Sequence, residues 1–215
     1  MAISNILDRR YLTEDTFVLR VERQSKIIKA GQCFSIGTRN LGINREYSMY
    51  SSSSDEWIEF LIRKIDQGAV STELGDIEIG KSIEVHGPFG EFCLSEETIT
   101  SNKFLFIASG VGIAPFSSFV KSFSNLDYSI LHGIRYEDEK YEYQQYIGNR
   151  YFPCISRPKE RSGRPMRVTD YLKTLSVANY SKIYLCGNQS MITDSVEILK
   201  AKNFLASEIF TEVFF

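Results

Sequence analysis

The chain has 215 residues and a formal net charge of −2, and 43% of its residues are hydrophobic and 13% aromatic. This composition predicts a well-packed globular protein and excludes a disordered chain and a strongly basic nucleic-acid-binding protein. The sequence has no apolar run of about 18 residues, and its first ten residues lack the apolar segment of a signal peptide. We therefore expect a soluble cytoplasmic protein without a membrane partner.

The histidines and cysteines restrict the metal chemistry. The four cysteines are scattered without a C-x-x-C pair: Cys33, Cys93, Cys154 and Cys186. This spacing excludes a simple zinc ribbon and a cysteine-ligated iron–sulfur cluster. Only His86 and His132 are present, too few for a histidine metal site without several carboxylates. We predict no metal and reduced thiols.

The first half of the chain alternates short β-rich runs with polar breaks, a pattern typical of antiparallel sheet. The expected strands are 16–21, 31–37, 46–50, 57–65 and 82–86. Short strands at this spacing predict a small antiparallel β-barrel. One short helix is expected from about Ser71 to Leu74, with Ser71 as its N-cap.

The second half alternates strands with helices, which predicts a doubly wound α/β domain with a parallel sheet. The expected strands are 104–108, 128–134, 151–156, 182–186 and 209–214, and the expected helices are one from 115, 139–147, 168–175 and 190–202. Residues 1–100 carry a net charge of −5 and residues 101–215 a net of +3. We expect two domains, 1–100 and 101–215, with the boundary in the unpatterned polar stretch 99–102.

A glycine turn links the apolar strand 104–108 to the helix that follows it. Gly110 and Gly112 leave this turn without side chains, so backbone N–H groups can approach a ligand. Pro115 suits the first helical position, and such a helix start attracts phosphate. Pro115 also stands where the third glycine of G-x-G-x-x-G belongs, so a purely structural joint stays an open alternative.

Four smaller motifs accompany the glycine turn. On a barrel strand, Arg45, Tyr47 and Ser48 would bring a cation, a flat ring and a hydroxyl close together, which could hold a flavin. An ordinary edge strand is the alternative. The run 63–71 ends a strand and opens a helix whose free N–H groups can take a pyrophosphate. The loop 87–90 is a tight turn, and the buried strand 182–186 ends in a cysteine and a glycine at the sheet edge where ligands bind in open α/β folds.

A basic segment indicates which nicotinamide dinucleotide the second domain prefers. Residues 150–173 contain seven Lys and Arg against two acids. An acidic residue that accepts from the ribose 2′-hydroxyl would favour NAD, whereas Ser156 and Arg157 after a strand, with Arg164 nearby, favour a 2′-phosphate. This composition points to NADP, and a solvated basic loop is the alternative.

The five motifs occur in the order R-x-Y-S, G-x-x-S, G-P-x-G, G-x-G-x-x-P and C-G-N over essentially the whole chain. In this order the sequence resembles the ferredoxin–NADP(+) reductase family, in its bacterial FAD-dependent form that is also called ferredoxin/flavodoxin–NADP reductase. The resemblance implies a Greek-key FAD-binding barrel followed by an NADP(H)-binding α/β domain. It also implies electron transfer between NADP(H), as a two-electron hydride, and a one-electron carrier protein, ferredoxin or flavodoxin.

The resemblance also implies site residues. Those expected to bind FAD are Arg45, Tyr47, Ser48, Ile62, Arg63, Lys64, Gly68, Ser71 and Phe215. Those expected to bind NADP(H) are Gly110, Gly112, Pro115, Ser156, Arg157, Arg164, Gly187, Asn188 and Met191. Those expected to be catalytic are Ser48, Cys186, Glu212 and Phe214.

The implied roles follow the chemistry of each side chain. Tyr47 would pack on the isoalloxazine ring, with Ser48 near its N5 and Cys186 near nicotinamide C4. The pyrophosphate of FAD would lie against Arg45, Ser71 and the main chain of 62–64. Buried cysteine as ordinary core is the alternative for Cys186.

The chain ends in Glu-x-aromatic-aromatic, which is similar to the tail of the bacterial reductases. By this likeness, Glu212 would tune charge or relay a proton, and Phe214 would cover the flavin face. Phe215 could stack on the FAD adenine. Phenylalanine replaces the more usual tyrosine or tryptophan, which preserves stacking and removes the polar group.

Other functions stay open alongside this interpretation. One is an NAD(P)H:flavin or quinone reductase of the same superfamily, and another is an electron-transfer subunit of a larger complex. Lys and Arg outnumber acids eight to four in residues 1–45, and a basic rim near the flavin would steer an acidic carrier protein. We expect a monomer that binds no nucleic acid.

Overall fold

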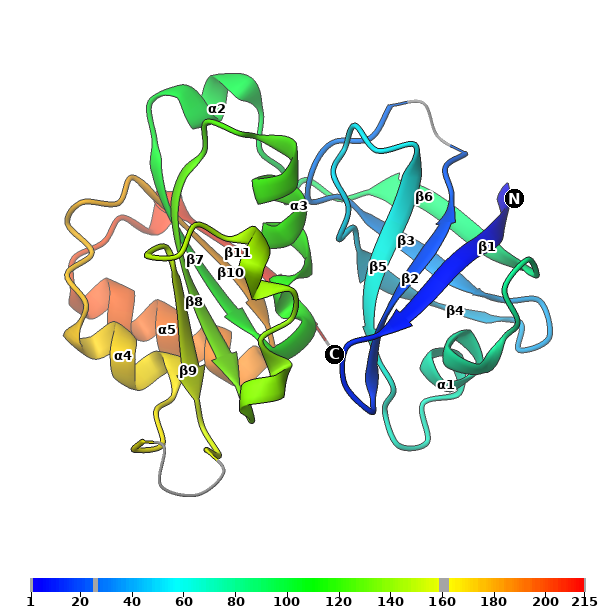
Figure 1. Ribbon diagram of the computed structural model, residues 1–215. Helices are drawn as coiled ribbons and strands as arrows, with labels where there is room; N and C mark the ends of the chain where they lie inside the picture. Colours follow the sequence, from blue (N-terminus) through cyan, green and yellow to red (C-terminus); the bar gives the residue numbers. More distant parts are fainter. Residues whose placement is uncertain (1, 25–26, 159–162, 215) are drawn as a thin grey trace. The chain divides into compact units, whose positions relative to one another are not determined.

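The computed structural model describes residues 2–24, 27–158 and 163–214 (Figure 1). The chain divides into two compact units, Met1–Leu94 with Ala114–Ser124 and Ser95–Ile113 with Asn125–Phe215. Helix α3 (Ala114–Ser122) therefore groups with the first unit, although it directly follows the glycine turn. The single boundary expected near residue 100 stays a prediction.

The first unit is an antiparallel sheet of six strands in the order β4-β3-β6-β1-β2-β5. Its strands are β1 (Ala2–Tyr11), β2 (Thr16–Glu22), β3 (Cys33–Thr38), β4 (Ile43–Ser48), β5 (Trp57–Arg63) and β6 (Ser82–Phe89). The sheet closes on itself where Met49 pairs with Phe60 and the Tyr50 N–H donates to the Glu59 carbonyl at 2.7 Å. The predicted antiparallel Greek-key barrel is confirmed.

Strand β1 was not predicted, although it lies in the middle of the sheet between β6 and β2. Its pairing with β2 is irregular between Ile6 and Asp8, which indicates a bulge. A bulge breaks the alternation of apolar and polar residues by which a strand is recognised in a sequence. Ile6 is buried whereas Leu7 is exposed, and polar residues follow, so the pattern is lost.

Helix α1 (Ala69–Asp76) follows β5 and begins two residues earlier than expected. Its N-cap is Gly68, so the prediction of Ser71 as N-cap is wrong. The Ser71 hydroxyl instead accepts from the Ile65 N–H and donates to the Gly68 carbonyl, both at 3.2 Å. Ser71 thereby closes the loop before the helix, and its side chain is not available to cap the helix from outside.

A buried carboxylate joins several elements of the first unit. Glu59 on β5 is 4% exposed and lies 2.7 Å from Arg10, 2.8 Å from Arg20 and 3.8 Å from Lys121 of α3. Burial alone would raise the pKa of Glu59, but hydrogen bonds from the two arginines and the charge of Lys121 outweigh it and hold this pKa below its ordinary value. The ionised carboxylate is therefore part of the folded structure.

Glu59→Gln should lower the free energy of unfolding by about 3 kcal/mol at pH 7, because three cations lose their buried counter-charge. A lowered pKa stabilises the fold above the unfolded-state pKa and loses this contribution as pH falls through the folded-state pKa. The difference between Glu59→Gln and the unmodified protein should therefore shrink below about pH 4. Urea unfolding at pH 7 and at about pH 3 measures it, with the exposed Glu56→Gln as control. Equal stability of Glu59→Gln and Glu56→Gln at pH 7 would contradict this assignment.

The second unit is a parallel sheet of five strands in the order β11-β10-β7-β8-β9. Its strands are β7 (Lys103–Ser109), β8 (Asp127–Ile134), β9 (Tyr151–Ile155), β10 (Lys182–Gly187) and β11 (Ile209–Val213), and its helices are α2 (Glu96–Thr100), α4 (Val168–Thr174) and α5 (Gln189–Ala201). One core of this unit packs β-strand side chains such as Leu105 and Leu131 with Leu172 of α4 and Leu199 of α5. From β7 the strand order continues to β8 and β9 on one side and to β10 and β11 on the other. The predicted doubly wound sheet is confirmed.

Two local predictions in the second unit are wrong. The helix expected over 139–147 is replaced by two short 3-10 helices, η2 (Glu137–Glu139) and η3 (Tyr143–Gln145). Glu142 between them has φ 44°, a left-handed conformation that stops a helix, and Tyr141 and Tyr146 are buried. The stretch expected to be unpatterned contains the end of α2, whose N-cap Ser95 accepts from the Thr98 N–H at 3.2 Å.

In the part of the chain that the structure describes, no helix is long and apolar enough to cross a membrane.

Candidate functional site

In the first unit, the R-x-Y-S residues lie on β4, beside the point at which β4 and β5 separate. Among the described residues, the segment just after β4 pairs with β5 at the Met49–Phe60 bridge. Strands β4 and β5 are not paired with each other at Arg45 and Arg63. Tyr47 is half-buried against the barrel core, and Ser48 on the other face is 2% exposed. Burial raises the pKa of Tyr47 to about 12 in spite of the nearby Arg45 charge. The ring therefore stays neutral and can stack on a flat ligand.

The predicted pyrophosphate contacts on β5 are not equivalent. The Lys64 N–H donates to the Asp15 carbonyl at 2.7 Å, and Ile62 pairs with Phe17, so both face β2. In an antiparallel pair alternate residues face opposite edges, so the Arg63 N–H faces the edge away from β2. Among the three main-chain positions, Arg63 is therefore the one suited to an external ligand.

The side chains at this point are also paired within the unit. The Arg63 Nε lies 2.8 Å from Asp15 Oδ2, and the Lys64 Nζ lies 2.7 Å from Asp76 Oδ1. Five residues separate the end of β5 from the start of helix α1, whose N-cap Gly68 makes no side-chain hydrogen bond to the helix. Its first N–H groups can donate hydrogen bonds to a bound anion.

The basic residues of the N-terminal segment do not form one surface rim. Arg10 and Arg20 bind the buried Glu59. Arg9 and Arg23 donate to backbone carbonyls of the same unit. These four side chains therefore support the barrel, and the described exposed cations of the set are Lys29, Arg39 and Arg45.

In the second unit, the glycine turn meets the end of β10 at the point where the strand order changes direction. Gly112 approaches so closely that an added Cβ would lie 2.4 Å from the Cys186 carbonyl oxygen. Gly187 has φ +140°, and an added Cβ would lie 2.1 Å from Ser109 Oγ. Both positions therefore require glycine, and together they leave a surface of bare backbone at the carboxyl edge of the sheet, where open α/β folds bind ligands.

Asn188 joins the ends of β7 and β10 and caps α5. Its N–H and its Nδ2 each donate to Ser109 Oγ at 3.0 Å. Its Oδ1 accepts from the Met191 N–H at 2.9 Å, which places Asn188 at the N-cap of the helix. Ser109 was not predicted as a site residue. The available signal was a hydroxyl at the end of an otherwise apolar buried strand.

The predicted catalytic residues of the second unit come together beside this joint. Cys186 pairs with Glu212 across β10 and β11, and the Phe214 N–H donates to the Gly187 carbonyl at 2.8 Å. Cys186 is fully buried, and burial, with a further contribution from Glu212, raises the pKa of its thiol well above the ordinary value. The thiol keeps its proton, which suits a neutral wall rather than a nucleophile. Phe215 lies outside the described residues.

Two arginines lie side by side at the carboxyl ends of β8 and β9. The Arg157 N–H donates to the Arg135 carbonyl at 2.8 Å, and Ser156 Oγ donates to the Ile134 carbonyl at 3.1 Å. Both arginine side chains are exposed. Arg135 was not predicted, because it is 22 residues from Arg157 and only the parallel register brings them together. Arg164 is also exposed.

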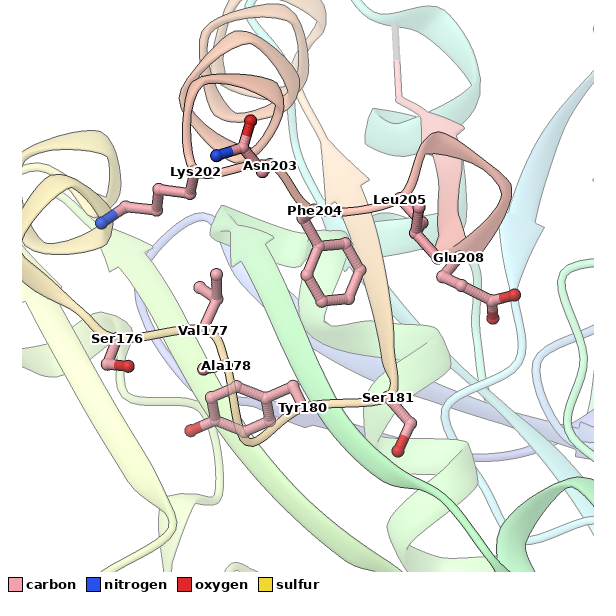
Figure 2. Close-up of a pocket in the computed structure, with 10 residues that line it drawn as sticks. All are labelled: Ser176, Val177, Ala178, Tyr180, Ser181, Lys202, Asn203, Phe204, Leu205 and Glu208. Atoms are coloured by element: carbon pink, nitrogen blue, oxygen red, sulfur yellow. The ribbon is translucent and has the colours of Figure 1, made fainter.

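A pocket of about 530 Å³ lies elsewhere in the second unit (Figure 2). It is lined by the loops that lead into β10 and β11, with the rings of Tyr180 and Phe204 directed into it. These loops are at the amino ends of the strands, whereas the glycines and arginines lie at the carboxyl ends. The ammonium of Lys202 is held by the carbonyls of Lys173 and Leu175. This pocket is therefore separate from the candidate nucleotide site.

The comparisons with known proteins agree with the geometry of both units. Residues 5–93 match the family model described as oxidoreductase FAD-binding domain, and residues 106–197 match the one described as oxidoreductase NAD-binding domain. A flavodoxin/ferredoxin–NADP reductase of Buchnera aphidicola is 25% identical over 92% of this chain and 89% of its own. The chain belongs to the FAD- and NAD-binding oxidoreductases that these two family models describe.

Two further similar proteins differ in how much of their own length this chain spans. The electron transfer component of toluate 1,2-dioxygenase from Pseudomonas putida is 26% identical over 99% of this chain, which spans 66% of that protein. The solved structure of a ferredoxin NADP+ reductase from Neisseria gonorrhoeae, with bound FAD and NADP, is 21% identical with a TM-score of 0.85. It covers 100% of this chain and 98% of its own, and at this identity the likeness shows the fold.

The residues present fit the two cofactors of the family, FAD and a nicotinamide dinucleotide. In the second unit, Gly112 and Gly187 form a cradle that any Cβ would fill, next to the N-terminus of α5. In the first unit, the neutral Tyr47 ring, the Ser48 hydroxyl and the N-terminus of α1 match a flat ring joined to phosphate. The individual site residues remain predictions.

Proposed function

We propose that this protein moves electrons between NADP(H) and a one-electron carrier protein, ferredoxin or flavodoxin, with FAD as its resident cofactor. The observation that carries the proposal is the carboxyl edge of the parallel sheet. There the side-chain-free joint of Gly112 and Gly187 suits a pyrophosphate. The adjacent Arg135 and Arg157 supply positive charge for a 2′-phosphate.

Bound FAD would supply the redox chemistry, accepting two electrons from the nicotinamide and releasing them one at a time. The protein's residues bind and orient. Tyr47 would stack on the flavin, and the Arg63 N–H with the N-terminus of α1 would hold phosphate. Cys186 would form a neutral wall beside the nicotinamide, because its buried thiol keeps its proton. Glu212, its neighbour across the strand pair, would hold or move a proton.

The toluate dioxygenase relative favours a second candidate, an electron-transfer component that delivers electrons within an oxygenase system. That relative matches 99% of this chain, but this chain spans only 66% of it. The carrier would then be a partner of the oxygenase rather than a freely diffusing ferredoxin. A reductase of free flavin or quinone is the third possibility.

Carrier specificity separates these functions. We expect the FAD-loaded protein, supplied with NADPH, to reduce a ferredoxin or a flavodoxin with a kcat/KM at least about tenfold above that for free FMN or menadione. Carrier reduction should also fall as ionic strength rises, because exposed cations attract an acidic carrier. Faster turnover with free FMN or menadione than with every carrier tested would contradict the proposal.

A further inference from the structure

His132 connects the glycine turn to the neighbouring strand from inside the second unit. It lies on β8, its ring is fully buried, and both ring nitrogens have partners. Nε2 lies 2.8 Å from the carbonyl oxygen of Gly110, the first residue of the turn. Nδ1 lies 2.8 Å from the hydroxyl of Tyr151, the first residue of β9.

The partners determine which nitrogen carries the hydrogen. A carbonyl oxygen only accepts, so Nε2 is protonated and donates to Gly110. In the neutral ring Nδ1 then accepts, and the hydroxyl of Tyr151 donates to it. Burial lowers the pKa of His132 to about 4 and raises the pKa of Tyr151, so both groups are neutral at physiological pH. The ring is held in one tautomer.

The Gly110 peptide is open on the side where a side chain would lie. Gly110 has φ +53°, and apart from its two chain neighbours no described residue has an atom within 4 Å of the position that its Cβ would take. On that side no packing contact restrains it, unlike Gly112, which is pressed against Cys186. In a trans peptide the C=O and N–H point in opposite directions. When His132 holds the Gly110 carbonyl, the Val111 N–H must point away from His132.

We propose that His132, held in one tautomer by Tyr151, is a positioning residue that orients the Gly110–Val111 peptide to bind the pyrophosphate of the dinucleotide. The proposal rests on the proposed function, because it assigns the glycine turn to a nicotinamide dinucleotide. Backbone N–H groups bind phosphate best when their direction is fixed beforehand. The buried side chains supply that fixed direction without touching the ligand.

The test uses two ligands that differ in the pyrophosphate. NADP+ contains it, whereas adenosine 2′-monophosphate carries the 2′-phosphate alone. Calorimetric titration of the FAD-loaded protein gives the Kd of each. In His132→Leu we expect the Kd of NADP+ to rise about tenfold and that of adenosine 2′-monophosphate to change less than about twofold.

Two further variants guard against general damage. His132→Gln places an amide N–H near the position of Nε2, so it should retain most of the affinity for NADP+. Tyr151→Phe keeps the ring but removes the donor to Nδ1, and we expect the Kd of NADP+ to rise about threefold. Nitrogen-15 NMR should find Nδ1 of His132 unprotonated in the unmodified protein and partly protonated in Tyr151→Phe.

Several results would overturn the proposal. These are unchanged NADP+ affinity in a folded His132→Leu, equal weakening of both ligands, or a proton on Nδ1 in the unmodified protein. If His132→Leu does not fold, the proposal is overturned when Tyr151→Phe binds NADP+ with the same Kd as the unmodified protein. If the unmodified protein binds neither ligand, the proposed function is wrong and this inference falls with it. If His132 in that protein still has the expected tautomer, the error lies in the assignment of the ligand and not in the hydrogen bonds of His132.

Discussion

Replacing Arg157 by alanine is expected to raise the KM for NADPH about 10- to 100-fold and to leave the KM for NADH within about twofold. The reason is that Arg157 and its neighbour Arg135 lie at the carboxyl edge of the sheet, where a 2′-phosphate would be bound by charge-assisted hydrogen bonds. NADH has no such phosphate. Steady-state kinetics with both nucleotides, using the same electron acceptor, measure the change.

The matched control is Arg150→Ala. Arg150 belongs to the same basic segment but lies at the amino end of β9, where its Nη1 donates to the Leu126 carbonyl at 2.8 Å. It should leave the preference between NADPH and NADH unaltered. If Arg157→Ala and Arg135→Ala both keep the full preference for NADPH, the 2′-phosphate is bound elsewhere and the assignment of these arginines is wrong.

Gly112→Ala is expected to slow the reduction of bound FAD by NADPH about 100-fold, the scale of a displacement of roughly 1 Å in an active site. An added Cβ would lie 2.4 Å from the Cys186 carbonyl oxygen and 2.8 Å from the Gly187 Cα. Both are backbone atoms of β10, so relief requires the strand and the turn to separate. The surface that should receive the dinucleotide is then distorted.

The control for this substitution is Gly148→Ala, an exposed position where nothing described lies within 4 Å of the added Cβ. NADPH should reduce the bound FAD of Gly148→Ala at the same rate as that of the unmodified protein. FAD content should stay normal in both variants, because the proposed flavin site belongs to the first unit. A Gly112→Ala variant that is reduced as fast as Gly148→Ala would show that this joint is not part of the nucleotide site.

Much of the fold follows from local patterns in the sequence. Strand β7 is a continuous apolar run. The glycine turn after it can be recognised in the sequence because Gly110 and Gly112 stand at fixed spacing. Strand β1 was missed because a bulge interrupts its alternation between Ile6 and Asp8. The helix expected over 139–147 does not form because Glu142 adopts a left-handed conformation, which local sequence does not reveal.

The site was less predictable, because its contacts join residues that are distant in the chain. Ser109 binds Asn188 across 79 residues, and His132 binds Gly110 across 22. Such pairs depend on the order and register of parallel strands, which local periodicity does not specify. Motif spacing could identify the glycines at the joint, but not the hydroxyl and imidazole that hold the joint together.

The most direct test of the central claim is anaerobic mixing of the FAD-loaded protein with NADPH or with NADH, following the absorbance of oxidised flavin. We expect NADPH to bleach the flavin rapidly and NADH at least about tenfold more slowly at equal concentration, because only NADPH offers the 2′-phosphate. Flavin that neither nucleotide reduces would contradict the account.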